Sequence, residues 1–149
     1  MTQYSTFYLG ERLFGLPILS VREIVRSWEI TPVPLAPAHF RGLMNLRGQT
    51  VTILDLGVRL GLEGRDPEAG SHVVVLSNDG QAQQDLAGFL VDSIGDVLEA
   101  DPAHLEPAPA NVFDAETRFL QGVVRTEAGL LVLLDLRTVL GHPSESALS

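Results

Sequence analysis

Two aspartates are the residues of this chain whose spacing most suggests chemistry. Asp55 and Asp135 lie 80 positions apart, and each follows an apolar run, Ile53-Leu54 or Leu133-Leu134. Two carboxylates that share one proton could activate water, as in an aspartyl hydrolase. That chemistry requires a small hydroxyl residue and then glycine after the aspartate, whereas leucine follows both. Each aspartate instead precedes a short apolar segment that ends in glycine, so we interpret both as helix N-caps.

The other reactive residue types form no recognisable site. The four histidines are far apart and lack metal-ligand spacing. Asp92 and Asp96 share one segment but lack the alternating oxygen ligands and central glycine of a calcium loop. The chain has no cysteine and no lysine, which excludes thiolate chemistry, a lysine Schiff base and a phosphate-binding loop. We expect no catalysis, no cofactor and no metal. An aspartyl hydrolase and a small-ligand-binding barrel are the less favoured alternatives.

The aspartates belong to an internal repeat. The segment 42–61 recurs 80 positions later as 122–141, and the segment 15–25 recurs 73 positions later as 88–98. A repeat of this length predicts two similar structural units built from one plan. Differences between the two copies can therefore indicate function.

The elements that carry these residues are short strands. The expected strands are apolar or β-branched runs separated by turn residues: 6–9, 13–18, 43–46, 51–54, 72–76, 86–91, 120–124 and 130–134. Short helices are expected after Asp55 and Asp135, and Asp101-Pro102 predicts another helical turn. The pattern predicts an all-β fold with short helices, in which two five-stranded barrels pack side by side.

The repeat also suggests how the chain is divided. We expect a single domain over 1–149, with barrel 1 over 6–66, barrel 2 over 71–141 and a frayed tail over 142–149. The polar segment 63–71 is the expected connector, and 77–85 is an expected enlarged hairpin loop.

Composition narrows the range of partners. The net charge is −9, and the ten arginines are scattered, which argues against binding to nucleic acid. The longest apolar run, Leu130 to Leu134, is far shorter than the ~18 residues of a membrane span. The N-terminal residues show no export signal, so we expect a cytoplasmic protein without membrane insertion.

The segment Asn45-Leu46-Arg47-Gly48 is the strongest candidate for a binding site. It joins two expected strands, so Arg47 and Gly48 should form a hairpin tip at which Gly48 has a positive φ. A solvated arginine on a turn is the simplest interpretation. The second copy has Glu127 where the first has Arg47, however, so the fold does not require an arginine there.

These residues resemble the CheW family of chemotaxis coupling proteins. The resemblance extends from about Thr6 to Gly141 and includes the segments 7–9, 15–18, 21–24, 42–48, 53–56, 91–92, 107–109 and 134–136, with Pro34. The Asn-Leu-Arg-Gly segment is its most specific part. Thr52 stands where the family usually has proline, and the absence of lysine gives an unusual surface. An accessory CheW-like protein of a pilus or surface-sensing system is therefore an alternative.

The resemblance implies two SH3-like barrels and a non-catalytic adaptor. Its partners would be the cytoplasmic tip of a methyl-accepting chemoreceptor and the regulatory domain of a CheA-like histidine kinase, in arrays associated with the membrane. The residues carried over as partner-binding are Val21, Glu23, Gly42, Asn45, Leu46 and Arg47, while Gly48 serves the turn. Val21 and Glu23 have counterparts in Ile94 and Asp96, which favours a folding role equally. Gly42 recurs as Gly122, which favours a structural need for a small residue over contact with a partner. The kinase would contact both barrel ends, where no residues are assigned.

Overall fold

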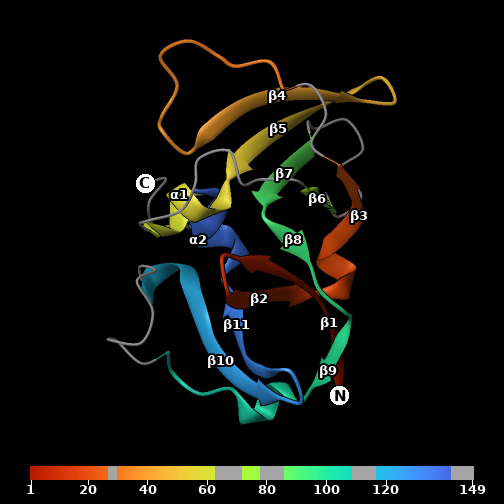
Figure 1. Cartoon of the computed structure of the whole chain (residues 1–149), viewed down its shortest axis with the longest axis vertical. Coiled ribbons are helices and arrows are strands. Elements are labelled where there is room, and N and C mark those ends of the chain that lie inside the picture. The colour runs from red at the N-terminus through yellow and green to blue at the C-terminus, as the bar shows by residue number, and fades with distance from the viewer. Residues whose placement is uncertain (27–29, 63–71, 78–85, 109–116, 142–149) are drawn as a thin grey trace, which may run out of the picture.

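Strands dominate the computed structural model, which describes residues 1–26, 30–62, 72–77, 86–108 and 117–141 (Figure 1). The expected connector at 63–71, most of the loop at 77–85 and the tail at 142–149 lie outside these residues. The strands are β1 (Thr2–Leu9), β2 (Arg12–Pro17), β3 (Val21–Arg26), β4 (Phe40–Leu46), β5 (Gln49–Asp55), β6 (His72–Leu76), β7 (Leu86–Val91), β8 (Ser93–Ile94), β9 (Leu98–Ala100), β10 (Leu120–Thr126) and β11 (Gly129–Leu134).

Short helices follow the aspartates, as the sequence predicts. The α-helices are α1 (Leu56–Leu60) and α2 (Leu136–Leu140), and the 3-10 helices are η1 (Ile18–Ser20), η2 (Pro102–His104) and η3 (Thr117–Phe119). Both α-helices end at a glycine in the left-handed conformation, Gly61 with φ 81° and Gly141 with φ 74°. Glycine adopts this conformation without the steric cost that a side chain would add.

The strands form two sheets with the same order of equivalent strands. One sheet has the order β3-β6-β7-β5-β4. The other, read from the equivalent edge, has the order β8-β1-β2-β11-β10, with β9 also paired to β1. The repeat makes β3 equivalent to β8 and β9 together, so the third strand of the second copy is divided in two. The all-β prediction of two five-stranded units is confirmed.

The two copies exchange their first hairpins. β1 and β2, from the first copy, lie in the sheet of β8 to β11, whereas β6 and β7, from the second copy, lie between β3 and β5. The expected division at 6–66 and 71–141 therefore does not follow the sheets. Sequence similarity shows which strands are equivalent, but it carries no information about which copy supplies each neighbour.

The exchanged hairpins pair with strands of the other copy at two equivalent places, and both pairings are parallel. Gly88 of β7 is opposite Ile53 of β5, and Gly15 of β2 is opposite Leu133 of β11. A Cβ atom on Gly88 would lie 2.6 Å from the side chain of Val73, and one on Gly15 would lie 2.9 Å from that of Leu131. Close packing therefore requires a small residue at both positions.

One core cluster joins the two sheets. It contains Phe7 and Phe14 of the first hairpin together with Phe89 of β7 and Phe119 of η3, all fully buried. The helices α1 and α2 are also joined, because the Arg59 Nε atom donates to the carbonyl oxygen of Val139 over 2.8 Å. The barrels thus share a core and form one body.

The segment β3 was not among the expected strands. Its six residues alternate between half-buried and exposed, and charged residues interrupt the apolar ones. β8 and β9 are short and were also missed. Ile18, expected at the end of a strand, instead begins η1.

The hairpin exchange predicts how fragments behave. Fragments 1–69 and 70–149, produced separately, should each lack a stable barrel, because each barrel needs one hairpin from the other fragment. Mixing them should restore β-sheet circular dichroism and one cooperative melting transition. A fragment that folds fully alone would contradict the exchange.

Candidate functional site

The β4–β5 hairpin has the tight turn that the sequence predicts. Arg47 and Gly48 both have positive φ angles, 50° and 84°, as in a type I′ turn. The backbone N–H of Gly48 donates to Oδ1 of Asn45 over 3.0 Å. This bond fixes the turn, so Arg47 is presented from a rigid position.

Arg47 forms an ion pair with Glu23 of β3. β3 and β4 are the first and last strands of their sheet, so the ion pair joins its two edges and helps to close the barrel. A backbone bridge between Thr31 and Leu43 closes the same seam. The Arg47 side chain remains 67% exposed and that of Glu23 25% exposed. A pair this accessible to water contributes little to stability.

The structure brings together three of the six residues proposed to bind partners. Asn45 is exposed beside the Arg47–Glu23 pair, while Leu46 is half-buried against the core cluster of barrel 1. Val21 begins β3 and packs, half-buried, against the core that the two sheets share. Sequence reasoning did not find the ion pair, because the partners are 24 residues apart and the seam forms only in the closed barrel.

Gly42 has a structural role that fully explains the residue type. It is buried at a bulge in β4 with φ +139°, and a Cβ atom there would lie 2.1 Å from the carbonyl oxygen of Thr31. Gly122, its counterpart, has φ +152°, and its Cβ would lie 2.4 Å from the carbonyl oxygen of Glu106. Both copies therefore need glycine where a neighbouring backbone crosses the bulge.

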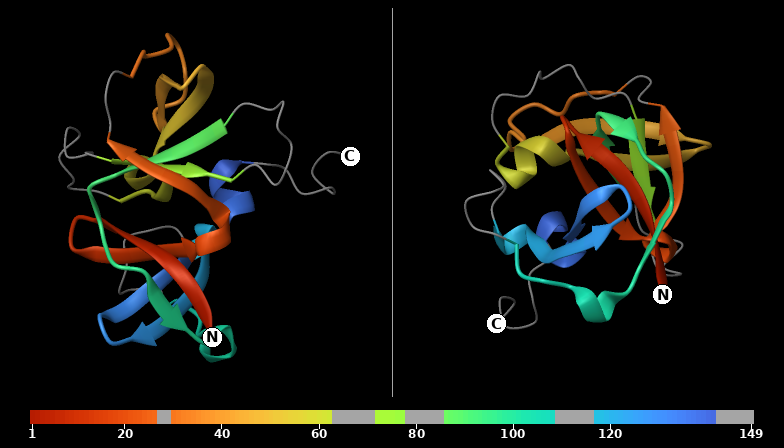
Figure 2. Two further views of the ribbon diagram at one scale, coloured as in Figure 1. Left: turned by 90° about the vertical axis from the view of Figure 1, so that its right-hand side faces the viewer. Right: turned by 60° about the horizontal axis from the view of Figure 1, so that its bottom comes forward.

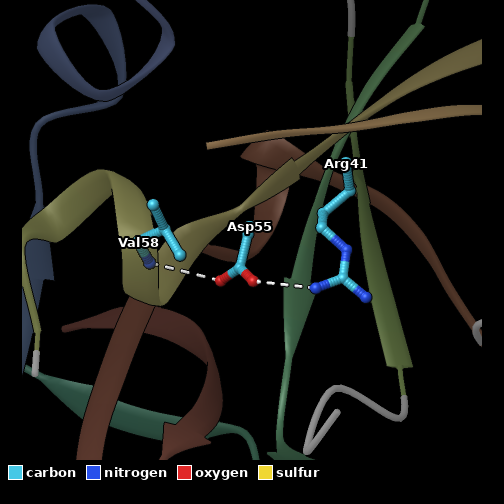
Figure 3. Close-up of polar contacts among 3 residues, drawn as sticks. All are labelled: Arg41, Asp55 and Val58. Atoms are coloured by element: carbon cyan, nitrogen blue, oxygen red, sulfur yellow. Dashed lines mark hydrogen bonds and ion pairs between the residues drawn. The ribbon is translucent and has the colours of Figure 1, made fainter. Parts of the chain in front are cut away.

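The two aspartates act as helix caps, as the sequence predicts. Asp55 Oδ1 accepts from the backbone N–H of Val58 over 3.2 Å, and Asp135 Oδ1 accepts from that of Thr138 over 3.4 Å. Asp55 is buried and also pairs with Arg41 over 3.4 Å (Figure 3). Within the residues that the structure describes, no three potential ligand side chains are grouped as a metal would require.

His39 lies close to Arg59 of α1 and contacts the aspartate that caps this helix. Burial and the nearby Arg59 guanidinium lower the pKa of His39. The imidazole is therefore neutral at pH 7. The backbone carbonyl of His39 accepts from the N–H of Asp55 over 2.7 Å, so His39 supports the capping residue through its main chain.

The fold and the site define a binding module built from paired barrels. The family model "CheW-like domain" matches residues 3–144. "Chemotaxis protein CheW" of Rhizobium meliloti is 36% identical over 140 residues, which cover 93% of this chain and 86% of that protein. "Probable chemotaxis protein CheW" of Rhizobium etli is 33% identical over 142 residues, which cover 95% and 88%.

A solved structure supports the same assignment. The crystal structure of scaffolding protein TtCheW from Thermoanaerobacter tengcongensis has a TM-score of 0.78 and 30% identity, and the match covers 93% of this chain and 86% of that one. The chain belongs to the CheW family, as the sequence resemblance indicated, and is a non-catalytic chemotaxis adaptor. In the described part of the chain, no helix has the length and apolar character needed to cross a membrane.

The two glycines of the β4–β5 hairpin should differ sharply in their tolerance of alanine. Gly42→Ala should lower the free energy of unfolding by about 3 kcal/mol or more, because its Cβ meets backbone. Gly48→Ala should cost only about 1 kcal/mol, because its Cβ meets nothing within 4 Å and only the positive φ is strained. Urea unfolding of both variants gives the comparison, and equal losses would contradict the bulge interpretation.

The two capping aspartates should also contribute unequally to the free energy of unfolding. Asp55→Ala removes a cap and the partner of Arg41, for a loss of about 2 kcal/mol, whereas Asp135→Ala removes a more exposed cap for about 1 kcal/mol. Thermal and urea unfolding measure both losses. If Asp135→Ala is the more destabilising change, the burial of Asp55 and its pair with Arg41 do not determine how much each cap contributes to stability.

Proposed function

We propose that this protein couples the cytoplasmic tip of a chemoreceptor to the regulatory domain of a CheA-like histidine kinase. Its relatives are named as chemotaxis proteins, and the solved neighbour is described as a scaffolding protein. The observation that carries the proposal is the ion pair of Arg47 with Glu23 at the exposed hairpin tip. Coupling takes place in the cytoplasm, in arrays beneath the membrane.

A comparison of the two copies supports a binding role for this pair. The counterparts of Glu23 and Arg47 in the second copy are Asp96 and Glu127, which are both acidic. No ion pair can form there, yet β10 and β11 pair in the same register as β4 and β5. The fold therefore needs neither the arginine nor the pair.

The geometry suggests how the contact works. Glu23 orients the Arg47 guanidinium, and the exposed part of that group can donate to a carboxylate on a partner in charge-assisted hydrogen bonds. Asn45 and Leu46, on β4, precede Arg47 and offer amide and apolar contacts, and Val21 lies two residues before Glu23 on β3. Gly42 lies in the supporting bulge and positions the strand without contacting a partner.

The adaptor acts by holding two partners on one rigid body. Because the barrels share a core, a contact on one barrel and a contact on the other are kept at a fixed separation. An array that is held by two modest contacts is then more stable than a complex that is held by either contact alone. Signals pass as shifts in coupled binding equilibria, without a chemical reaction.

Arg47→Glu should weaken assembly without unfolding the protein. The charge reversal removes the guanidinium and places a second carboxylate beside Glu23, at a site that contributes little to folding. We expect the fraction that sediments with receptor fragments and kinase to fall by about tenfold, with a melting temperature within about 2 °C of wild type.

Arg125→Glu is the matched control. Arg125 is 80% exposed on β10, and its reversal changes the net charge by the same amount on the other barrel. Assembly should be affected much less than by Arg47→Glu. Unchanged assembly with Arg47→Glu would show that Arg47 is not at the interface.

A further inference from the structure

The loop between β3 and β4 holds a leucine in a backbone conformation that disfavours it. Leu35 has φ +63°, and among the residues that the structure describes Arg47 is the other non-glycine residue with a positive φ. Leu35 follows Pro34 in a turn, as in type II turns, whose third residue has a positive φ and is favoured as glycine or asparagine. A leucine there is strained, because its Cβ atom crowds the backbone. The fold by itself would therefore favour another residue.

Burial does not compensate for this strain. The Leu35 side chain is fully exposed, and Val33, two residues earlier, is 38% exposed. No residue in the segment 32–38 has a polar side chain, although the segment forms a surface loop of a protein with a net charge of −9. Strained backbone conformations of this kind are concentrated at functional sites. An exposed and strained leucine therefore points to a role outside the folding of this chain.

Hydrogen bonds hold the loop at both ends. Thr31 and Leu43 each donate a backbone N–H to the carbonyl oxygen of the other over 2.8 Å, and the N–H of Phe40 donates to the carbonyl oxygen of Pro37 over 2.9 Å. Three prolines restrict the backbone between these bonds. Leu35 is therefore presented from a fixed turn, and a partner that binds it would cause little loss of conformational entropy.

The second copy keeps the prolines of this loop but not its larger apolar residues. The backbone bridge of Glu106 with Val123 corresponds to the bridge at the start of the loop. It aligns the sequence Pro-Ala-Pro-Ala of 107–110 with Pro-Val-Pro-Leu of 32–35. Both prolines recur, whereas alanine takes the place of both larger apolar residues. Valine and leucine at these two positions are thus a feature of the first copy alone.

The loop lies at one end of the molecule. It forms the top of Figure 1 and of the left view of Figure 2, whereas β9 and the N-terminus lie at the opposite end. The loop precedes β4 and the hairpin tip with Arg47 follows it, and the seven residues of this strand span about 20 Å. The Leu35 turn and the Arg47–Glu23 pair are therefore two separate points of contact.

We propose that Leu35 is the anchor by which this protein docks to the regulatory domain of its kinase, an inference that rests on the proposed function. A single leucine on a rigid turn needs an enclosed apolar pocket, which a globular domain can offer. Because the loop carries no charge, the pocket is uncharged as well. Burial of Leu35 in this pocket offsets the strain of the turn. The Arg47–Glu23 pair is then left to the receptor.

Leu35→Asn separates the contribution of this residue to binding from its contribution to stability. Asparagine accepts a positive φ more readily than leucine, so the melting temperature should rise by about 3 °C. Binding to the purified regulatory domain of the kinase, measured by isothermal titration without receptor, should weaken at least about tenfold, because the pocket no longer receives an apolar side chain. One variant should thus be more stable and bind less well.

Three further variants control for other causes. Leu35→Ala keeps the strained φ and removes the contact, so it should bind as weakly as Leu35→Asn without the rise in melting temperature. Leu35→Met keeps a long apolar side chain and should bind within about threefold of wild type. Val97→Asn removes an apolar side chain that is 51% exposed beside the other sheet, and it should bind the regulatory domain like wild type.

The inference is overturned if Leu35→Asn binds the regulatory domain as tightly as wild type does, or if Val97→Asn loses as much affinity. A wild-type protein that binds a receptor fragment but not the regulatory domain would overturn the proposed coupling together with this inference. Weaker binding of Leu35→Asn to the receptor fragment, with unchanged binding to the regulatory domain, would refute docking to the kinase and assign the loop to the receptor.

Discussion

The exchange of hairpins between the two copies is the constraint on which the rest of this structure depends. β2 pairs with β11 and β7 pairs with β5, so each barrel is completed by strands from the other half of the chain. These parallel contacts join residues distant in sequence, and the shared cluster of Phe7, Phe14, Phe89 and Phe119 forms only when both exchanges are made. The rigidity that an adaptor needs follows from this interdependence, because neither barrel can open without exposing part of the other.

The duplication separates what the fold requires from what a partner requires. Features present in both copies have structural explanations: the aspartate caps, the left-handed glycines after the helices, and Gly42 and Gly122 beneath a crossing backbone. Three features that occur only in the first copy have no such explanation. The Arg47–Glu23 pair, the exposed Leu19 and the unpaired arginines of β3 have no equivalents in the second copy, although both barrels close in the same way. Physical necessity explains the first group, which makes the second group the natural place to look for binding.

Electrostatics sets how these surfaces can act. Among the residues that the structure describes, the exposed arginines without an ion pair or hydrogen bond are those of β3, in a protein whose net charge is −9. An exposed ion pair adds little to folding, but an oriented guanidinium can distinguish a partner that presents a carboxylate from one that does not. Binding at such a surface is therefore governed more by the position of charge than by the area buried.

The sequence by itself determined the kinds of local structure and the family. Asp-Leu followed by glycine five residues on identified both capped helices, Arg47-Gly48 identified the hairpin tip, and the repeat identified equivalent strands, because each of these signals depends on residues close together in the chain. The alternation of charged and apolar residues concealed β3, and the boundaries expected at 6–66 and 71–141 did not follow the sheets. Only the tertiary structure decided which copy supplies each hairpin and that Glu23 meets Arg47. The physical reason is that equivalent strands offer similar pairing edges and apolar faces, so the choice between them depends on packing of the whole core.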